Sequence, residues 1–201
     1  MSQGRRDTVS PFFVRADVMN TPLAIELRTE RLLLRPLSIA DAPAIERLAG
    51  DERVARFTSN IPHPYPDGAA KAFVSESLDK QARDEVRTFA ITLAGNPQDL
   101  IGMVGLIDRG ASEVEIGYWL GVSHWGDGLM SEAVAAVAAH GRDWRPGATL
   151  AARTFPDNHA SQRVLEKAGF VRRGTGVCDA PARDQERIED APLYVLEPPA
   201  A

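Results

Sequence analysis

The most constraining part of the sequence is a segment in which a strand pattern passes through a glycine turn directly into a helix pattern. Residues 115–120 (EIGYWL) have strand character, residues 125–128 (WGDG) form the turn, and a stretch rich in Ala and Val follows. Such a junction leaves backbone N–H groups unpaired at the positive end of the helix dipole. Phosphate groups commonly bind at such a helix start. The segment therefore predicts a site for a phosphorylated cofactor.

The composition limits the classes of partner. The chain has 201 residues, enough for one domain with a sizeable core that needs no disulfide or metal. Its formal net charge of −5 argues against sequence-independent nucleic-acid binding and suits an amine-bearing partner. The single cysteine, Cys178, excludes an internal disulfide, and the four histidines show no metal-ligand spacing. We therefore expect neither a metal nor a nucleic-acid partner.

Targeting features point to a cytoplasmic protein. No apolar run approaches the roughly 20 residues of a membrane span, so no membrane association is expected. Arg5 and Arg6 suggest an export signal, but charged residues interrupt the apolar run that would have to follow. Residues 1–22 lack periodicity, and we expect a flexible extension or a tail that packs only in an oligomer such as a homodimer. Residues 23–201 are expected to form the folded domain.

Hydrophobic periodicity divides the folded part into groups of strands and helices. Strands are expected at residues 25–34 (as a pair), 88–93, 100–107, 114–120, 149–155, 171–176 and 193–196, and helices at 38–49, 67–82, 129–140 and 158–167. A charged loop is expected between the last two strands. Short turns join the three middle strands, which favours an antiparallel meander. This order predicts an α/β domain with a largely antiparallel sheet and not a doubly wound nucleotide-binding fold.

Two longer motifs extend this interpretation. The first is GYWL at residues 117–120 with WGDGLMSEA at 125–133, and the second is NHASQRVLEKAGF at 158–170. They resemble, in this order, the acyl-CoA loop and the N-x-x-S-x-x-V/L-x-x-K-x-G-F helix of the GCN5-related N-acetyltransferases (GNAT), in particular the RimJ/RimL-like branch. TERLLLRP at residues 29–36 is similar to the opening strand of that branch. The resemblance implies a single-domain GNAT fold, with a mixed, mostly antiparallel sheet of about six or seven strands flanked by about four helices.

The same resemblance implies transfer of an acetyl group from acetyl-CoA to a primary amine, on a protein N-terminus or a small molecule. No residue stands out as a covalent acyl carrier, so direct transfer in a ternary complex is expected. The candidates for contact with the cofactor are Trp119, Leu120, Val122, Trp125, Gly126, Asp127, Gly128, Leu129, Met130, Asn158 and Ser161. Residues 126–130 would bind the pyrophosphate through their backbone, and the strand end before them would hold the pantetheine arm. An amide near Leu120 would polarise the thioester.

Two residues are candidates for catalysis. Ser161 would donate a hydrogen bond to the CoA sulfur, and a solvated helix position is the structural alternative. Glu115 shares a strand face with Gly117 and Trp119 by alternation and would act as a base through water. A structural ion pair at Glu115 is equally consistent with the sequence.

Other polar residues are weaker candidates. His124 and His159 are expected in a loop and in a first helical turn, positions that do not favour a catalytic base. His63 and Tyr65 lie in the proline-rich loop at residues 60–66, which would either contact the acceptor or pack on the core. The acceptor itself is not identified by these residues.

Two residues depart from the family pattern. Asp127 places a negative charge where relatives often carry Lys or Arg beside the pyrophosphate, which would weaken binding unless the side chain faces solvent. Met130 replaces a small residue, which is compatible with binding through its N–H.

A non-catalytic acyl-CoA-binding sensor or adaptor with this fold is the alternative function. Another nucleotide-binding enzyme is disfavoured because the sequence has no G-x-x-x-x-G-K-[ST] motif.

Overall fold

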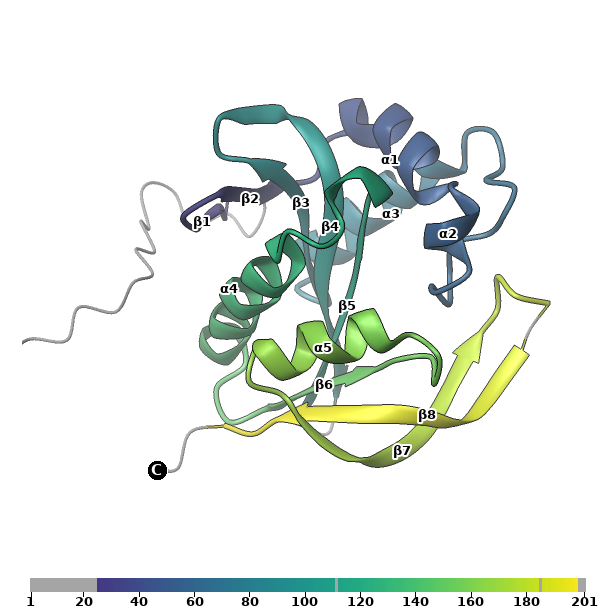
Figure 1. Cartoon of the computed structure of the whole chain (residues 1–201). Coiled ribbons are helices and arrows are strands. Elements are labelled where there is room, and N and C mark those ends of the chain that lie inside the picture. Colours follow the sequence, from purple (N-terminus) through teal and green to yellow (C-terminus); the bar gives the residue numbers. More distant parts are fainter. Residues whose placement is uncertain (1–24, 111, 185, 199–201) are drawn as a thin grey trace, which may run out of the picture.

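The computed structural model describes residues 25–110, 112–184 and 186–198 of the chain. The expected extension at residues 1–22 lies outside these ranges, and the domain boundary at residue 23 stays a prediction. Within the ranges, the strands form one eight-stranded sheet with helices on both faces (Figure 1). No helix there combines the length and apolar composition that crossing a bilayer requires.

The sheet is mixed, and its neighbouring strands are antiparallel except for β5 and β6. Its spatial order is β1-β2-β3-β4-β5-β6-β8-β7. The strands are β1 Leu27–Arg28, β2 Leu32–Pro36, β3 Val86–Leu93, β4 Asn96–Gly110, β5 Glu113–Leu120, β6 Thr149–Arg153, β7 Val171–Ala180 and β8 Glu186–Leu196. Parallel neighbours need a crossover connection, and a helix supplies it between β5 and β6. The strand–turn–helix segment of the sequence is the start of this crossover.

Local sequence signals explain where the helices begin. The helices are α1 Ala42–Ala49, α2 Glu52–Ala55, α3 Ala69–Ala82, α4 Leu129–Trp144 and α5 His159–Lys167, with 3₁₀ turns η1 Ile39–Asp41 and η2 Val122–His124. Ser38 and Asp41 form a capping box ahead of α1, and the Ser38 amide donates to the Asp41 carboxylate at 2.8 Å. Asn158 caps α5, because its side-chain oxygen accepts from the Ser161 amide at 3.0 Å.

Each face of the sheet carries a core cluster covered by its own helices. The α4–α5 face buries Ile91, Leu106 and Val134, whereas the α1–α3 face buries Ile45 and Ala90. Neighbours such as Ala90 and Ile91 join different clusters because successive strand residues point to opposite faces. In Figure 1, α4 and α5 lie in front of the sheet and α3 lies behind it. The molecule is therefore a three-layer structure, and it has the α/β class that the sequence predicted.

Several element counts and bounds need correction. The described residues form eight strands, where the resemblance implied about six or seven and the hydrophobic periodicity indicated eight, and they form five helices instead of about four. The extra helix, α2, has four residues and is too short to produce a periodic pattern. α4 continues to Trp144, about one turn beyond the predicted end at residue 140.

The largest correction concerns the last two strands. The charged stretch expected as a loop is mostly strand, because β7 continues to Ala180 and β8 already begins at Glu186. β7 is an edge strand whose side chains are largely exposed, so polar residues fit there and no apolar alternation marks it. Arg187 on β8 also pairs with Asp179 across the hairpin at 3.2 Å. Charge composition alone therefore gave the wrong prediction for this hairpin.

Candidate functional site

The candidate site lies where β5 and β6 separate. The two strands pair at Glu113–Thr149, Val114–Leu150 and Glu115–Ala151, and the ladder of the described strands ends there. β5 then continues for five residues to Leu120, paired with β4 alone. The β5 edge that faces β6 is consequently open from Ile116 onward.

Two hydrogen bonds define which backbone groups face this opening. The Ser112 carbonyl accepts from the Thr149 amide on the β6 side at 2.9 Å, and the Gly121 amide donates to Ile101 on the β4 side at 2.8 Å. Backbone groups alternate between the two sides of a strand, so even-numbered residues of β5 face β6. The amides of Tyr118 and Leu120 therefore point into the opening. The Leu120 carbonyl is already used, because it accepts from the Trp125 indole at 2.7 Å.

The glycine turn leads from this edge into α4. Gly126 and Gly128 have φ angles of +90° and +76°, in the left-handed region that favours glycine. Gly128 is the N-cap of α4, and no side chain caps the helix at this end. The first intrahelical bond runs from the Glu132 amide to the Gly128 carbonyl, so the amides before Glu132 have no helical acceptor. The helix start therefore has amides without helical acceptors, and anion binding there stays a prediction.

A polar clamp holds this turn against the start of the sheet. The Arg31 guanidinium, between β1 and β2, donates to the Glu132 carboxylate at 2.7 Å and to the Asp127 carbonyl at 2.9 Å. The Arg31 amide and the Thr29 hydroxyl also donate to Glu132, at 2.9 and 2.5 Å. Although burial opposes it, these hydrogen bonds from Thr29 and Arg31 keep the pKa of Glu132 below its ordinary value. Glu132 therefore ties the first turn of α4 to β1 and β2.

The N-terminal end of α5 contacts β5 at the opening. The Tyr118 phenol oxygen lies 2.8 Å from the Ser161 hydroxyl oxygen, where either group can donate, and 3.2 Å from the Ser161 carbonyl oxygen, a second acceptor for the single phenol hydrogen. Ser161 is held from the other side by Asn158, which accepts its amide hydrogen. The structure therefore brings the start of α5 into contact with the open edge of β5, and η2 and the glycine turn lead from the end of the same strand to the uncapped start of α4.

Comparison with known proteins agrees with this geometry. Residues 31–171 match the family model described as Acetyltransferase (GNAT) domain. The chain belongs to the GNAT acetyltransferase family. A protein of Bacillus subtilis (strain 168) named "Probable N-acetyltransferase YjcK" is 34% identical over 155 residues, covering 74% of this chain and 84% of that protein. As a member of this family the chain is an acyltransferase.

Solved structures share the same architecture. RimL, a ribosomal L7/L12 alpha-N-protein acetyltransferase, superposes with a TM-score of 0.67 at 20% identity, covering 84% of this chain and 91% of RimL. The Microcin C7 self immunity acetyltransferase MccE, solved in complex with acetyl-CoA and AMP, gives a TM-score of 0.71 at 18% identity, covering 90% and 99%. At identities this low, the TM-scores establish only that the fold is shared. The shared fold confirms the predicted GNAT architecture.

The structure places the predicted cofactor residues of this GNAT enzyme in different environments. Leu129 and Met130 are buried, so the Met130 side chain points into the core and leaves only its amide for a ligand. Trp125 is 45% exposed beside the turn. Val122 begins η2 between β5 and the turn. Trp119 is different, because its indole packs against the α1–α3 cluster and alternation directs its backbone groups to β4.

The candidate bases are dispersed around the site. Glu115 forms an ion pair with Arg109 at 2.6 Å and lies at the closed end of the opening, in the last pair with β6. His159 is an exposed residue of the first turn of α5, as predicted. His124 ends η2 and is half-buried. The structure does not bring these side chains together.

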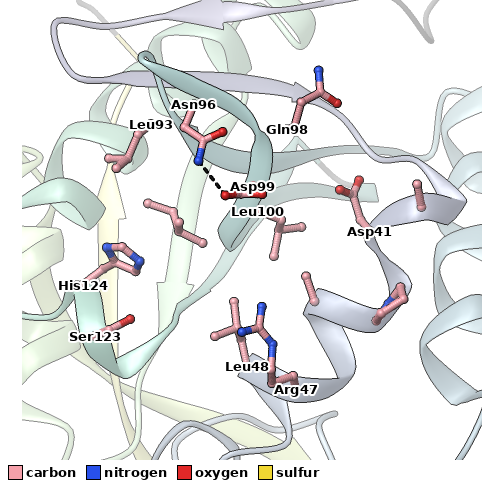
Figure 2. A pocket seen from close by; sticks show the side chains of 14 residues that line it. Asp41, Arg47, Leu48, Leu93, Asn96, Gln98, Asp99, Leu100, Ser123 and His124 are labelled. Carbon is pink, nitrogen blue, oxygen red and sulfur yellow. Dashed lines mark hydrogen bonds between the residues drawn. The ribbon is translucent and has the colours of Figure 1, made fainter.

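His124 instead lines a separate cavity of about 520 Å³. Figure 2 shows His124 on one side of the cavity and Arg47, from α1, on the other, with Leu48 beside Arg47 and with Leu100 among the lining residues. Leu48 also lies close to Gly121, the residue after β5, since a Cβ built on Gly121 would lie 3.2 Å from its Cδ2. None of the predicted cofactor residues lines it, so this cavity is distinct from the opening between β5 and β6.

The proline-rich loop at residues 60–66 packs on the core. The His63 ring bonds the Gly50 carbonyl at 2.8 Å, and Tyr65 packs against the α1–α3 cluster. Nearby, the tip of the β7–β8 hairpin reaches the segment after α2, where the Ala182 amide donates to the Ser59 carbonyl at 3.0 Å. In the described part of the chain, no three His, Cys, Asp or Glu side chains gather as metal ligands.

Two residues of the site were missed by the sequence interpretation. Arg31 lies in the TERLLLRP segment, which was assigned to an opening strand only. Tyr118 alternates with Ile116 and Leu120 and therefore resembled a core residue. The signal that could have identified Arg31 is the pair of opposite charges at Arg31, in the TERLLLRP segment, and Glu132, in the WGDGLMSEA motif.

Proposed function

We propose that this acyltransferase moves the acetyl group of acetyl-CoA directly to a primary amine bound in a ternary complex. The observation that carries the proposal is the continuity of the site, since the open β5 edge continues through η2 and the glycine turn into the uncapped start of α4. The acceptor classes that we propose are a protein N-terminus and a small-molecule amine. Family membership and the fold shared with RimL support acetyl transfer in general.

The residues present fit a phosphorylated thioester. The amides of the turn and the first turn of α4 suit a pyrophosphate, because they lack helical acceptors at the positive end of the dipole. An extended chain with its own amide groups can add to the open β5 edge as a strand would. The Leu120 amide is directed to this edge and can polarise the thioester carbonyl. When bound, acetyl-CoA supplies an activated acyl group and a thiolate leaving group.

Ser161 would act on the sulfur of the leaving group, and Asn158 would contact the cofactor. We propose that the Ser161 hydroxyl donates a hydrogen bond to the sulfur. Asn158 uses its side-chain oxygen for the helix cap, which leaves its NH₂ group for the cofactor. Both residues are held by α5, so the donors are oriented before the substrates bind.

The acceptor is proposed to approach the α1–α3 face of β5. Gly117 lies on this face, and a Cβ built on it would meet no atom within 4 Å. The hydrogen-bonded contact between the β7–β8 hairpin and the segment after α2 is the proposed outer wall. Glu115 lies on the same face of β5 and is the proposed base, acting through water.

A turnover screen tests this function. Release of CoA from acetyl-CoA is measured with N-terminal peptides, polyamines, amino acids and aminoglycosides as acceptors. We expect release that depends on one of these amines, and a thermal shift with acetyl-CoA that ATP and NAD do not produce. Binding of acetyl-CoA with no turnover on any amine would instead indicate a non-catalytic acyl-CoA-binding module.

The role of Glu115 can be separated from its ion pair. Glu115→Gln should lower kcat about 10-fold at pH 7 with an N-terminal amine, because an α-amino group with a pKa near 8 is already about one-tenth neutral. Glu113→Gln is the matched control, since Glu113 also forms an ion pair, with Arg153 at 3.4 Å, two residues away on the same face. Equal kcat values for both variants and the wild type would leave Glu115 only a structural role.

The charge of Asp127 has a testable consequence. The side chain is exposed, and among the described residues no hydrogen bond or ion pair reaches its carboxylate. Asp127→Lys should bind acetyl-CoA about 5- to 10-fold more tightly at low salt, because a charge of the favourable sign replaces a repulsive one. Asp79→Lys, on α3, controls for net charge. Calorimetry showing unchanged or weaker binding would mean that residue 127 faces away from the phosphates.

A further inference from the structure

Tyr118 is the hydrogen-bond partner of Ser161, the residue that we propose contacts the CoA sulfur. It lies on the part of β5 that is paired with β4 but not with β6, three residues beyond the last pair with β6. Its phenol oxygen is 2.8 Å from the Ser161 hydroxyl oxygen. No other described group bonds this serine hydroxyl. The side chain of Ser161 is therefore oriented by Tyr118, whereas its backbone is oriented by Asn158.

The direction of this hydrogen bond decides what Ser161 can do. A serine hydroxyl has one hydrogen and rotates freely unless a partner fixes it. When the phenol donates to the serine oxygen, the serine hydrogen is left for a third atom. The serine oxygen, at 2.8 Å, is a nearer acceptor for the single phenol hydrogen than the Ser161 carbonyl, at 3.2 Å, and the proposal takes this direction of the bond. The serine hydrogen is then available to an acceptor in the opening.

The phenol does not serve as the acid itself. Burial raises the pKa of Tyr118 above its ordinary value of 10.0, against the opposing effect of the hydrogen bond with Ser161. A thiol has a reference pKa near 8.5, so transfer of the phenol proton to a thiolate is unfavourable by a factor of at least about 30. The phenol consequently stays neutral and keeps donating. It acts through its hydrogen bond and not by losing a proton.

We propose that Tyr118 is a positioning residue that directs the Ser161 hydroxyl hydrogen toward the CoA sulfur. The proposal rests on the proposed function, in which Ser161 is the group that contacts the sulfur. Tyr118 does not contact the substrate in this scheme. Its effect is to keep the donor aligned when negative charge develops on the leaving thiolate.

The test measures the acidity of bound CoA as well as turnover. The thiol of CoA bound to the full chain is titrated by thiolate absorbance, in the wild type and in Tyr118→Phe, Ser161→Ala and the double variant. A hydrogen bond to the thiolate lowers its pKa, so we expect each single variant to raise it by about one unit. Tyr118→Phe should also lower kcat about 10-fold while KM for acetyl-CoA is unchanged. The double variant should match Ser161→Ala, because Tyr118 acts only through Ser161.

Tyr194→Phe is the matched control. Tyr194 is a buried tyrosine of β8 whose phenol donates to Glu166 at 3.1 Å, so the substitution removes a similar bond from the same helix without touching Ser161. We expect it to leave the thiol pKa and kcat at wild-type values. A shift caused equally by Tyr194→Phe would overturn the proposal, as would additive effects of Tyr118→Phe and Ser161→Ala. If CoA binds but no amine is acetylated, the proposed function fails while the titration still decides the role of Tyr118.

Discussion

Replacing Gly128 with valine is expected to weaken acetyl-CoA binding about 100-fold. Gly128 has a φ angle of +76°, a conformation that costs an L-residue about 1–2 kcal/mol and a β-branched residue more. The turn would relax, and the amides at the start of α4 would lose their common direction. Loss of one charge-assisted hydrogen bond adds about 1.5–3 kcal/mol. Calorimetric titration with CoA and acetyl-CoA measures the change.

Gly147→Val separates this effect from loss of stability. Gly147 has a φ angle of +81°, and a Cβ there would meet no atom within 4 Å, so the backbone penalty is comparable. It lies between α4 and β6, at the far end of the helix from the turn. We expect Gly147→Val to lower the melting temperature and keep acetyl-CoA affinity. Equal affinities for the two variants would exclude the turn as the phosphate site.

Replacing Gly102 with alanine is expected to lower the free energy of unfolding by about 3 kcal/mol, the upper end for overpacking. Gly102 of β4 faces Leu120 of β5 in a pair without mutual hydrogen bonds, where the Cα atoms approach most closely. An added Cβ would lie 2.6 Å from the Trp119 carbonyl oxygen and 3.0 Å from the Leu120 Cα. Both are backbone atoms, so β4 and β5 would have to separate. Thermal melts should show a loss of about 6–12 °C.

Gly105→Ala is the control on the same strand. A Cβ on Gly105 would lie 3.4 Å from the Arg87 carbonyl and 3.5 Å from the Thr88 hydroxyl, close to ordinary contact distances. Glycine-to-alanine changes also reduce the entropy of the unfolded chain, which stabilises the folded state by about 0.4–1 kcal/mol. We expect Gly105→Ala to stay within about 1 kcal/mol of the wild type. A loss at Gly105 as large as that at Gly102 would contradict the close-approach argument.

Local signals in the sequence predicted much of this fold. Ser38 with Asp41 and Asn158 with Ser161 are caps whose partners lie three residues apart, so composition and spacing suffice to find them. The turn before α4 is equally local. The hairpin of β7 and β8 was predicted poorly because its exposed edge strand carries polar residues, and pairing with β8 is what makes it a strand.

The contacts of the candidate site depend on residues distant in the chain. Thr29 and Glu132, which hold the turn against β1 and β2, are 103 residues apart, and Tyr118 and Ser161 are 43 residues apart. No periodicity or propensity links such positions. Glu115 shows the same limit, since its partner Arg109 lies across the β4–β5 hairpin and the sequence left the ion pair and the base open.

The sequence by itself determined the family, the α/β class and the glycine turn that begins α4, because each depends on residue types at short, fixed spacings. Tertiary structure decided that β5 separates from β6 after Glu115, that Glu132 and Arg31 hold the turn in place, and that Tyr118 orients Ser161. The physical reason is that these features are contacts between separate elements. Their geometry exists only after both core clusters have packed the helices against the two faces of the sheet.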